Sequence, residues 1–282
     1  MSDQNDEIKL VLDKVERFLR QERELYGEFL YTADSVQPSQ QKAVSVKPRL
    51  PQQALDELDL FGKPAAPKIP LKKSVRHVDH PYPNEAWVSA TTLDDLNGQI
   101  CQCLKCSLGK TRTNFVFGVG NPQADVVVIG EAPGADEDEQ GEPFVGRAGQ
   151  LLNKILEAIR FKREEVYICN ILKCRPPNNR DPLPEEIELC EPYLWKQMEI
   201  IKPKMILCLG RIAGQALLKT NDSLSALRGK FFDYRGIKLM VTYHPAALLR
   251  NPNWKKPAWE DVQLFRKTYD EMKSTGEPAG NP

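Results

Sequence analysis

Residues 124–149, ADVVVIGEAPGADEDEQGEPFVGRAG, contain the stretch that decides the fold. The run 124–129 is apolar and rich in β-branched valine, which predicts a buried strand. After the stretch, a helix over 148–159 is predicted because apolar residues recur on one helix face, at Leu151, Leu152, Ile155, Leu156 and Ile159. The segment between them is therefore a strand-to-helix loop. Open α/β sheets bind ligands at such loops, because the carboxyl ends of strands and the amino ends of helices converge there.

The same alternation of strands and helices continues along the chain. Further strands are predicted at 166–171, 205–209 and 237–242, and further helices at 184–201, at 212–219 and from 254 onward. Strands that alternate with helices form a parallel sheet covered on both faces. The sequence thus predicts an α/β fold, a three-layer α/β/α sandwich around a central, mainly parallel four-stranded sheet.

The N-terminal part of the chain differs in composition from the rest. Residues 1–31 carry an apolar stripe with helical spacing, which predicts an amphipathic helix that packs on this chain or on a protein partner. Residues 32–86 are rich in Pro, Gln, Ser and Lys and are expected to form a flexible linker. The folded domain is expected at 87–273, with Thr92 capping its first helix, and 274–282 are expected to be a disordered tail.

One segment of the linker, 53–61, interrupts its polar composition. It places Leu58, Leu60 and Phe61 close together, and apolar anchors in a linker are often docking peptides. Glu57-Leu-Asp-Leu-Phe61 resembles the pentapeptide by which bacterial DNA enzymes bind the replication sliding clamp, although that motif begins with Gln. The alternative is a chance cluster of apolar residues.

Charge and hydropathy restrict the class of protein. The chain has 39 basic and 39 acidic residues, so its net charge does not predict a nucleic-acid partner, yet basic residues recur in the later loops, where they can bind phosphate. We find no apolar run that would span a bilayer and no signal-peptide core, so we expect a cytoplasmic protein without a membrane partner. A monomer is the default expectation.

The cysteines point to a metal centre. In a reducing compartment, seven cysteines argue for metal binding or catalysis rather than disulfides. Four of them, from two regions of the chain, are candidate ligands for tetrahedral zinc or for an iron–sulfur cluster: Cys103, Cys106, Cys174 and Cys190. Their spacing does not separate these two alternatives, and Cys101 with Cys103 is an alternative amino-terminal pair. Cys169 and Cys208 lie in apolar strand runs and are expected to be buried small hydrophobes.

Four motifs occur in an order that resembles the family 4 uracil-DNA glycosylases. They are Gly130-Glu-Ala-Pro-Gly134, Pro143-Phe-Val-Gly-Arg-Ala-Gly149, Asn170-Ile-Leu-Lys-Cys-Arg-Pro-Pro177 and His244-Pro-Ala-Ala-Leu-Leu-Arg250. The resemblance covers about 92–273 and leaves the N-terminal arm outside. It implies a DNA repair enzyme that releases uracil from DNA and leaves an abasic site. It also implies a [4Fe–4S] cluster held by Cys103, Cys106, Cys174 and Cys190.

The resemblance further implies roles for residues of the uracil site. Phe144 would stack on the flipped base, and the amide of Asn170 would read the Watson–Crick edge of uracil and reject cytosine. Glu137 would block the 5-methyl group of thymine. His244 would donate a hydrogen bond to uracil O2 as negative charge grows there, and Glu131 would orient the attacking water. Asp136 and Glu137 are the alternatives for this last role.

Contacts with DNA are implied at three more positions. Leu248, with Leu249, resembles the wedge that fills the space left by a flipped base, while Arg250 and Arg211 would hold phosphates. Such an enzyme would be associated with the nucleoid. Two rival hypotheses are a non-catalytic iron–sulfur module that binds uracil or DNA, and a replication-linked adaptor that works through its N-terminal arm.

Overall fold

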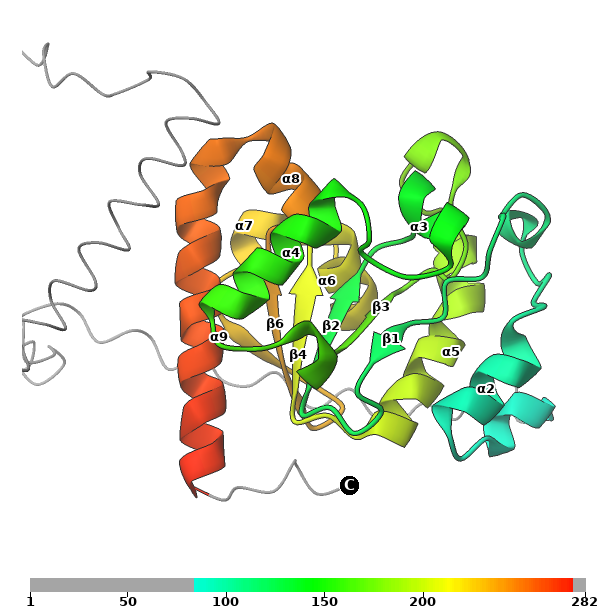
Figure 1. Ribbon diagram of the computed structural model, residues 1–282, viewed down its shortest axis with the longest axis horizontal. Helices are drawn as coiled ribbons and strands as arrows, with labels where there is room; N and C mark the ends of the chain where they lie inside the picture. Colours follow the sequence, from blue (N-terminus) through cyan, green and yellow to red (C-terminus); the bar gives the residue numbers. More distant parts are fainter. Residues whose placement is uncertain (1–83, 276–282) are drawn as a thin grey trace, which may run out of the picture. The chain divides into compact units, whose positions relative to one another are not determined.

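The computed structural model describes residues 84–275 (Figure 1). The predicted N-terminal helix, the clamp-like peptide at 53–61 and most of the predicted tail lie outside the described residues. At the start of the described part, Thr92 caps the first helix as predicted, because its hydroxyl accepts a hydrogen bond from the backbone N–H of Asp95 (3.2 Å). None of the helices within 84–275 is long and apolar enough to cross a membrane.

Six strands form one sheet in the order β1-β3-β2-β4-β6-β5. Their bounds are β1 Val119–Gly120, β2 Val126–Gly130, β3 Tyr167–Asn170, β4 Met205–Leu209, β5 Phe231–Tyr234 and β6 Ile237–Thr242. The four central strands are parallel, which confirms the predicted mainly parallel core. The predicted number of four strands is wrong, because two antiparallel strands, β1 and β5, extend the sheet at its edges.

The two edge strands have weak sequence signals. Strand β1 is only two residues long, and β5 is mostly half-buried, so neither shows the continuous apolar run of a central strand. Strand β5 forms a hairpin with β6 through Arg235 and Gly236, whose φ angles of 53° and 84° are the paired positive values of a tight hairpin turn.

Helices connect the strands and cover the sheet. The α-helices are α2 Leu93–Ile100, α3 Ala135–Gln140, α4 Arg147–Ala158, α5 Pro184–Ile201, α6 Arg211–Leu218, α7 Leu224–Leu227, α8 Pro245–Arg250 and α9 Lys255–Thr275. Short 3₁₀ helices lie at η2 Ala86–Ser89, η3 Ser107–Lys110, η4 Arg163–Glu165, η5 Pro177–Asn179 and η6 Pro252–Trp254.

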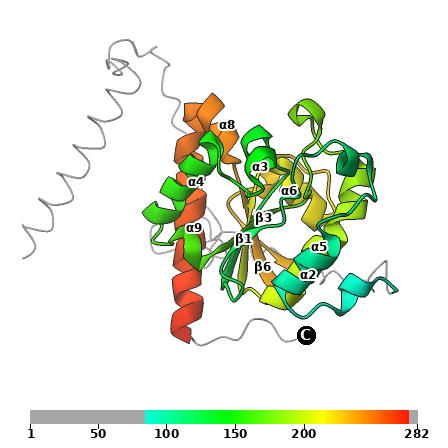
Figure 2. The same cartoon turned by 45° about the vertical axis from the view of Figure 1, so that its right-hand side comes forward.

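The two faces of the sheet bury two separate cores, which confirms the three-layer sandwich. Because side chains alternate along a strand, Val127 and Ile129 of β2 face a core shared with α2, α5 and α6, whereas Val126 and Val128 face a core shared with α4 and α9. Figures 1 and 2 show α4 and α9 on one side of the sheet and α2 and α5 on the other. The continuous burial of β2 and β4 follows from this double cover.

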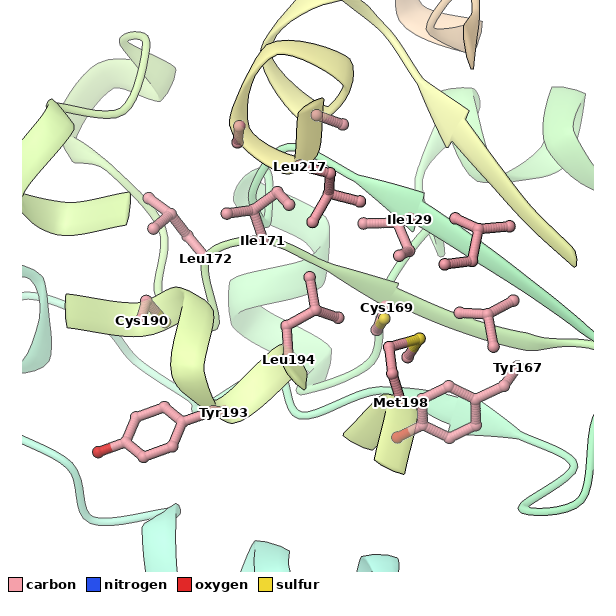
Figure 3. Packing of buried hydrophobic residues seen from close by; sticks show 14 of the residues in the cluster. Ile129, Tyr167, Cys169, Ile171, Leu172, Cys190, Tyr193, Leu194, Met198 and Leu217 are labelled. Atoms are coloured by element: carbon pink, nitrogen blue, oxygen red, sulfur yellow. The ribbon is translucent and has the colours of Figure 1, made fainter. Parts of the chain in front are cut away.

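The core between the sheet and α5 holds some of the cysteines (Figure 3). Cys169 of β3 packs there with Leu194 and Met198 of α5. Cys169 and Cys208 are both fully buried, as predicted for small hydrophobic residues. Burial raises the pKa of both thiols, so they stay neutral.

A lysine ammonium group also lies in this core. Lys173 is fully buried, and its Nζ donates to the backbone oxygen of Asn170 (2.9 Å) and to Oε1 of Gln197 (2.6 Å). The amide nitrogen of Gln197 in turn donates to the backbone oxygen of Phe117 (3.0 Å) and to Oη of Tyr167 (3.1 Å). Burial lowers the pKa of Lys173. The network supplies hydrogen-bond acceptors to Nζ of Lys173, which is too deeply buried to bond to solvent.

We expect Gln197→Leu to lower the free energy of unfolding by about 1–3 kcal/mol, because it removes one hydrogen-bond acceptor from the buried Nζ of Lys173. The measurement is urea unfolding of the variant beside Gln150→Leu, the same substitution at an exposed position of α4. The Gln150 variant should unfold within about 0.5 kcal/mol of the wild type. Equal midpoints for the two variants would show that the acceptor contributes nothing.

Candidate active site

A cavity of about 510 Å³ lies at the carboxyl ends of the parallel strands. Figure 1 shows α3, α8 and the start of α4 at this end of the sheet. Seven of the residues predicted for the site line the cavity: Glu131, Glu137, Phe144, Asn170, Arg211, His244 and Arg250. They lie at the carboxyl ends of β2, β3, β4 and β6 or in the segments that directly follow these strands, which lie far apart in the sequence. The parallel sheet brings them together because these strands all end at one edge.

Asn170 is the last residue of β3 and is 1 % exposed. Its side-chain oxygen, Oδ1, has no hydrogen-bond partner among the described residues. A buried acceptor without a partner is costly and needs an explanation, and a donor on a ligand would satisfy it. Gly130 makes this arrangement possible, since a Cβ there would lie 2.3 Å from Asn170 Oδ1 and 2.6 Å from Cζ of Phe144. The glycine thus lets the amide and the ring lie against the end of β2.

His244 immediately precedes α8 and caps it. Its Nδ1 accepts a hydrogen bond from the backbone N–H of Ala246 (3.2 Å). Burial, and then the charge of Arg250, lowers the pKa of His244 to about 4. The ring is therefore neutral near pH 7, and because Nδ1 is an acceptor the proton is on Nε2. The site thus holds a neutral imidazole with one N–H left to donate.

Phe144 is held in a strained conformation beside His244. Its φ of 55° lies in the left-handed region, which is unfavourable for an aromatic residue. Its ring lies 5.5 Å from the His244 ring, centroid to centroid, with 31° between the planes. The carboxylate of Glu137 fixes the loop around it, accepting from the backbone N–H groups of Val145 and Gly146 (both 3.0 Å) and of Gly134 (3.1 Å). Glu137 thus ties together the two loop segments that carry the site.

We expect Glu137→Ala to cost about 1–3 kcal/mol of stability and to reduce kcat/KM, because three backbone N–H groups lose their acceptor and the strained backbone of Phe144 loses its restraint. Thermal unfolding and steady-state kinetics on uracil-containing DNA measure the two effects. The matched control is Glu139→Ala, an exposed glutamate two residues further along α3. Similar kinetics for the two variants would contradict the role assigned to Glu137.

The carboxylate of Glu131 lines the cavity and has no hydrogen-bond partner among residues 84–275. It directly follows β2, and burial raises its pKa to about 7. Repulsion from Asp181 adds to this rise, and attraction to Arg211 opposes it. Arg211 and Asp181 form an ion pair of 3.2 Å beside it. Of the two alternatives to Glu131, Asp136 does not line the cavity and Glu137 is bonded to the backbone.

The loop after Cys174 also lines the cavity, through Pro176, Asn179, Arg180 and Asp181. Arg180 is tied to the start of α5 by a bidentate ion pair with Glu186 (2.6 and 2.9 Å). Asp181 was missed by the sequence reasoning. Its position in the loop between two candidate cysteine ligands was the only signal in the sequence.

Helix α8 carries the predicted DNA wedge. The side chain of Leu248 is buried, 2 % exposed, and does not line the cavity. Leu249, in contrast, is 37 % exposed. The choice of Leu248 as the contact residue is corrected for this reason: one face of a short helix must pack on the domain, and Leu248 lies on that face. Leu249 is the leucine that α8 leaves exposed.

Of the four candidate cysteine ligands, Cys174 and Cys190 are buried in the core between the sheet and α5, and Cys103 and Cys106 are half-buried and pack against that core. Three of the sulfurs accept hydrogen bonds, from Oη of Tyr193 to Cys103 (3.2 Å), from Nη1 of Arg112 to Cys174 (3.3 Å) and from the backbone N–H of Lys173 to Cys190 (3.3 Å). Burial raises the pKa of Cys174 to about 11 and that of Cys190 to about 12, and repulsion between the thiols adds to both rises. The sulfurs are therefore within electrostatic reach of one another.

Among residues 84–275, no three side chains of His, Cys, Asp or Glu lie close enough to hold one metal ion. Four cysteine sulfurs are a donor set that suits an iron–sulfur cluster and also tetrahedral zinc. The thiol of Cys101 donates to the backbone oxygen of Gly98 (3.7 Å).

Comparisons with known proteins agree with this geometry. The family model of the uracil DNA glycosylase superfamily matches residues 117–263. A type-4 uracil-DNA glycosylase of Archaeoglobus fulgidus is 47 % identical over 67 % of this chain and 94 % of its own length. Those of Saccharolobus solfataricus and Thermotoga maritima are 46 % and 44 % identical, over 64 % and 56 % of this chain and 87 % and 84 % of their own. The chain belongs to the uracil DNA glycosylase superfamily and, within it, to the type-4 uracil-DNA glycosylases.

Proposed function

We propose that this chain hydrolyses the N-glycosidic bond of uracil in DNA, releasing free uracil and leaving an abasic site. One observation supports this most: a cavity that joins an unpaired buried acceptor, Asn170 Oδ1, to a neutral imidazole with an available N–H, His244. Uracil carries the complementary groups, a donor at N3 and acceptors at O2 and O4. Cytosine has an acceptor at N3, so it would leave the amide oxygen unpaired.

The uracil reaches this cavity by leaving the base stack, because the glycosidic bond of a base in a duplex is not accessible. The ring of Phe144 supplies a stacking surface. The amide of Asn170 accepts from N3–H and donates to O4. Glu137, tied to the backbone amides around Phe144, limits the space beside the base where thymine carries its methyl group.

Cleavage places negative charge on the departing uracil and positive charge on the deoxyribose, so catalysis consists largely of placing countercharges. The bond between C1′ and N1 breaks, and N1 and O2 of uracil share its electron pair. The Nε2–H of His244 donates to O2 as this charge grows. Glu131, as a carboxylate, stabilises the sugar cation and orients a water whose oxygen bonds to C1′. The proton released by that water passes to the carboxylate.

The DNA contacts come from the rim of the cavity. Arg250 and Arg211 provide positive charge for phosphates flanking the uracil, and Leu249 fills the space that the flipped base leaves.

We further propose that the enzyme acts as a monomer, that it works on the nucleoid in the cytoplasm, and that Glu57–Phe61 binds the replication sliding clamp.

The four cysteines Cys103, Cys106, Cys174 and Cys190 would hold a [4Fe–4S] cluster. Such a cluster has no redox role in a hydrolysis, and it would cross-link chain segments. Hydrogen bonds from Tyr193, Arg112 and the Lys173 backbone to three of the sulfurs stabilise the thiolates that a cluster requires. Because Cys174 and Cys190 flank the loop with Asn179 and Asp181, the cluster would fix this wall of the cavity.

We expect Cys174→Ser to lose iron and to lower both the unfolding temperature and the activity. Iron and sulfide analysis of the purified chain, with its visible absorption, measures the cluster directly. The control is Cys101→Ser, which should keep a full complement of iron because Cys101 bonds to Gly98 instead. Full iron content in Cys174→Ser would contradict the proposed ligand set.

The activity is tested with an end-labelled oligonucleotide that carries one uracil, beside matched strands with thymine or cytosine at that position. Hot alkali after incubation breaks the strand wherever a base has been lost. Breaks only at uracil, and their loss in Asn170→Ala with an unchanged unfolding temperature, are the expected result. An absence of breaks with the folded, iron-containing protein would favour a binding module without turnover.

A further inference from the structure

A partly exposed tryptophan lies beside the candidate active site and has no place in the proposed reaction. Trp254 ends the 3₁₀ helix η6, which closely follows α8. Its ring stacks on Tyr243, with the centroids 5.3 Å apart and 22° between the planes. Tyr243 is the residue directly before His244. Trp254 remains 40 % exposed although a tryptophan ring is the largest apolar surface that a side chain can bury.

The stack beneath Trp254 is rigidly supported. The guanidinium carbon of Arg228 lies 5.3 Å from the centroid of the Tyr243 ring. Arg228 is fixed by a bidentate ion pair with the buried carboxylate of Asp261 (2.7 and 3.0 Å), which also accepts from the hydroxyl of Thr242 on β6 (2.7 Å). Because these groups are ordered before any ligand binds, a ring that stacks on Trp254 would meet a preformed platform.

The segment around Trp254 carries only positive charge. Residues 243–259 contain Arg250, Lys255 and Lys256 and no Asp or Glu. Arg250 and Lys256 are exposed, and Arg250 also lines the cavity. Leu249 adds an exposed apolar side chain on α8. An exposed aromatic ring among basic side chains is the combination that binds single-stranded nucleic acid, because the bases stack while the cations attract the phosphates.

We propose that Trp254 stacks on a base adjacent to the uracil in the same DNA strand, at the point where the strand leaves its helical stack to deliver uracil to the cavity. This inference rests on the proposed function. The occupant is a nucleobase rather than a peptide, since the basic side chains of this segment are complementary to phosphates and the ring stacks on Tyr243, the residue directly before His244. Every base has a π face, so this contact adds affinity without adding sequence preference.

The test is a double-mutant cycle between the protein and its substrate. The wild type, Trp254→Ala, Trp254→Phe and Trp259→Ala are compared on a single strand with one uracil and on the same strand with abasic analogues at both positions flanking the uracil. Trp259 lies on α9, is equally exposed and serves as the matched control. Both kcat/KM for uracil release and affinity by fluorescence anisotropy are measured, after unfolding temperatures have shown that each variant is folded.

We expect Trp254→Ala to lower kcat/KM and affinity on the normal strand about 10-fold, within the roughly 5- to 150-fold range for loss of one base-stacking contact. Abasic analogues at the flanking positions should lower kcat/KM and affinity of the wild type by a similar factor. They should cause little further loss in Trp254→Ala, which already lacks the stacking ring. Trp254→Phe should keep most of the wild-type kcat/KM and affinity, because its ring can still stack. Trp259→Ala should match the wild type in both. Equal losses for Trp254→Ala on both strands would overturn the stacking contact. If neither the wild type nor any variant releases uracil, the proposed function fails. The same cycle of affinities, measured by fluorescence anisotropy, then tests the stacking contact of Trp254 by itself.

Discussion

Glu131→Gln is expected to lower kcat for uracil release about 10²–10⁴-fold at pH 8, the usual effect of removing a positioned base. The amide has nearly the shape of the carboxylate but neither its charge nor its basicity, so KM should change little. Rapid-quench single-turnover measurements isolate the chemical step from product release. The matched control is Glu139→Gln, on the exposed side of α3. Equal rates for Glu131→Gln and the wild type would move the role to another group.

The pH dependence gives a second, independent measure of Glu131. Burial raises its pKa to about 7, and in the proposed mechanism it acts only when ionised, so kcat/KM, which reports the groups of the free enzyme, should fall about tenfold for each pH unit below 7. Burial lowers the pKa of His244 to about 4, so His244 does not titrate in this range. Asp181→Asn should shift this fall in rate to lower pH, because it removes a charge that repels the Glu131 carboxylate and frees Arg211 to attract it. If the fall in rate below pH 7 persists in Glu131→Gln, the titrating group is not Glu131.

The fold and the lining of the site could largely be predicted from the sequence. The valine-rich run before Gly130 and the apolar runs at β3, β4 and β6 have a strong strand pattern because helices bury them on both faces. Since parallel strands end at one edge, placing Glu131, Asn170, Arg211 and His244 after four such strands was enough to bring them together.

What the sequence did not predict depends on orientation and on long-range contacts. Leu248 and Leu249 are identical in chemistry and adjacent in sequence, and only the packing of α8 decides which one is buried. The anchoring of Glu137 to the backbone around Phe144 depends on a strained loop with no periodic pattern. Asp181 reaches Glu131 across the cavity from the cysteine loop, and a contact between such distant positions leaves no local signal.

His244→Ala is expected to lower kcat about 10²–10³-fold, because it removes the side chain that we propose donates to uracil O2 as negative charge develops there. The loss should appear in kcat rather than in affinity, since the charge exists only in the transition state. His244→Gln, whose amide can still donate, should recover part of the rate. His77→Ala, a histidine outside the four motifs, serves as the control for the substitution itself.

The protonation state separates this role from that of a cationic histidine. Because the backbone N–H of Ala246 donates to Nδ1 and the pKa is lowered to about 4, the ring should be the neutral Nε2–H tautomer from pH 5 to pH 8. Nitrogen-15 chemical shifts of His244 measure this directly. An imidazolium signal at pH 7 would contradict the neutral Nε2–H tautomer. A buried imidazolium beside Arg250 would need a nearby negative charge, and in this cavity that charge would have to come from Glu131. A neutral signal that persists to pH 5 would leave the ring as a preorganised donor, which stabilises the departing uracil anion without first being protonated.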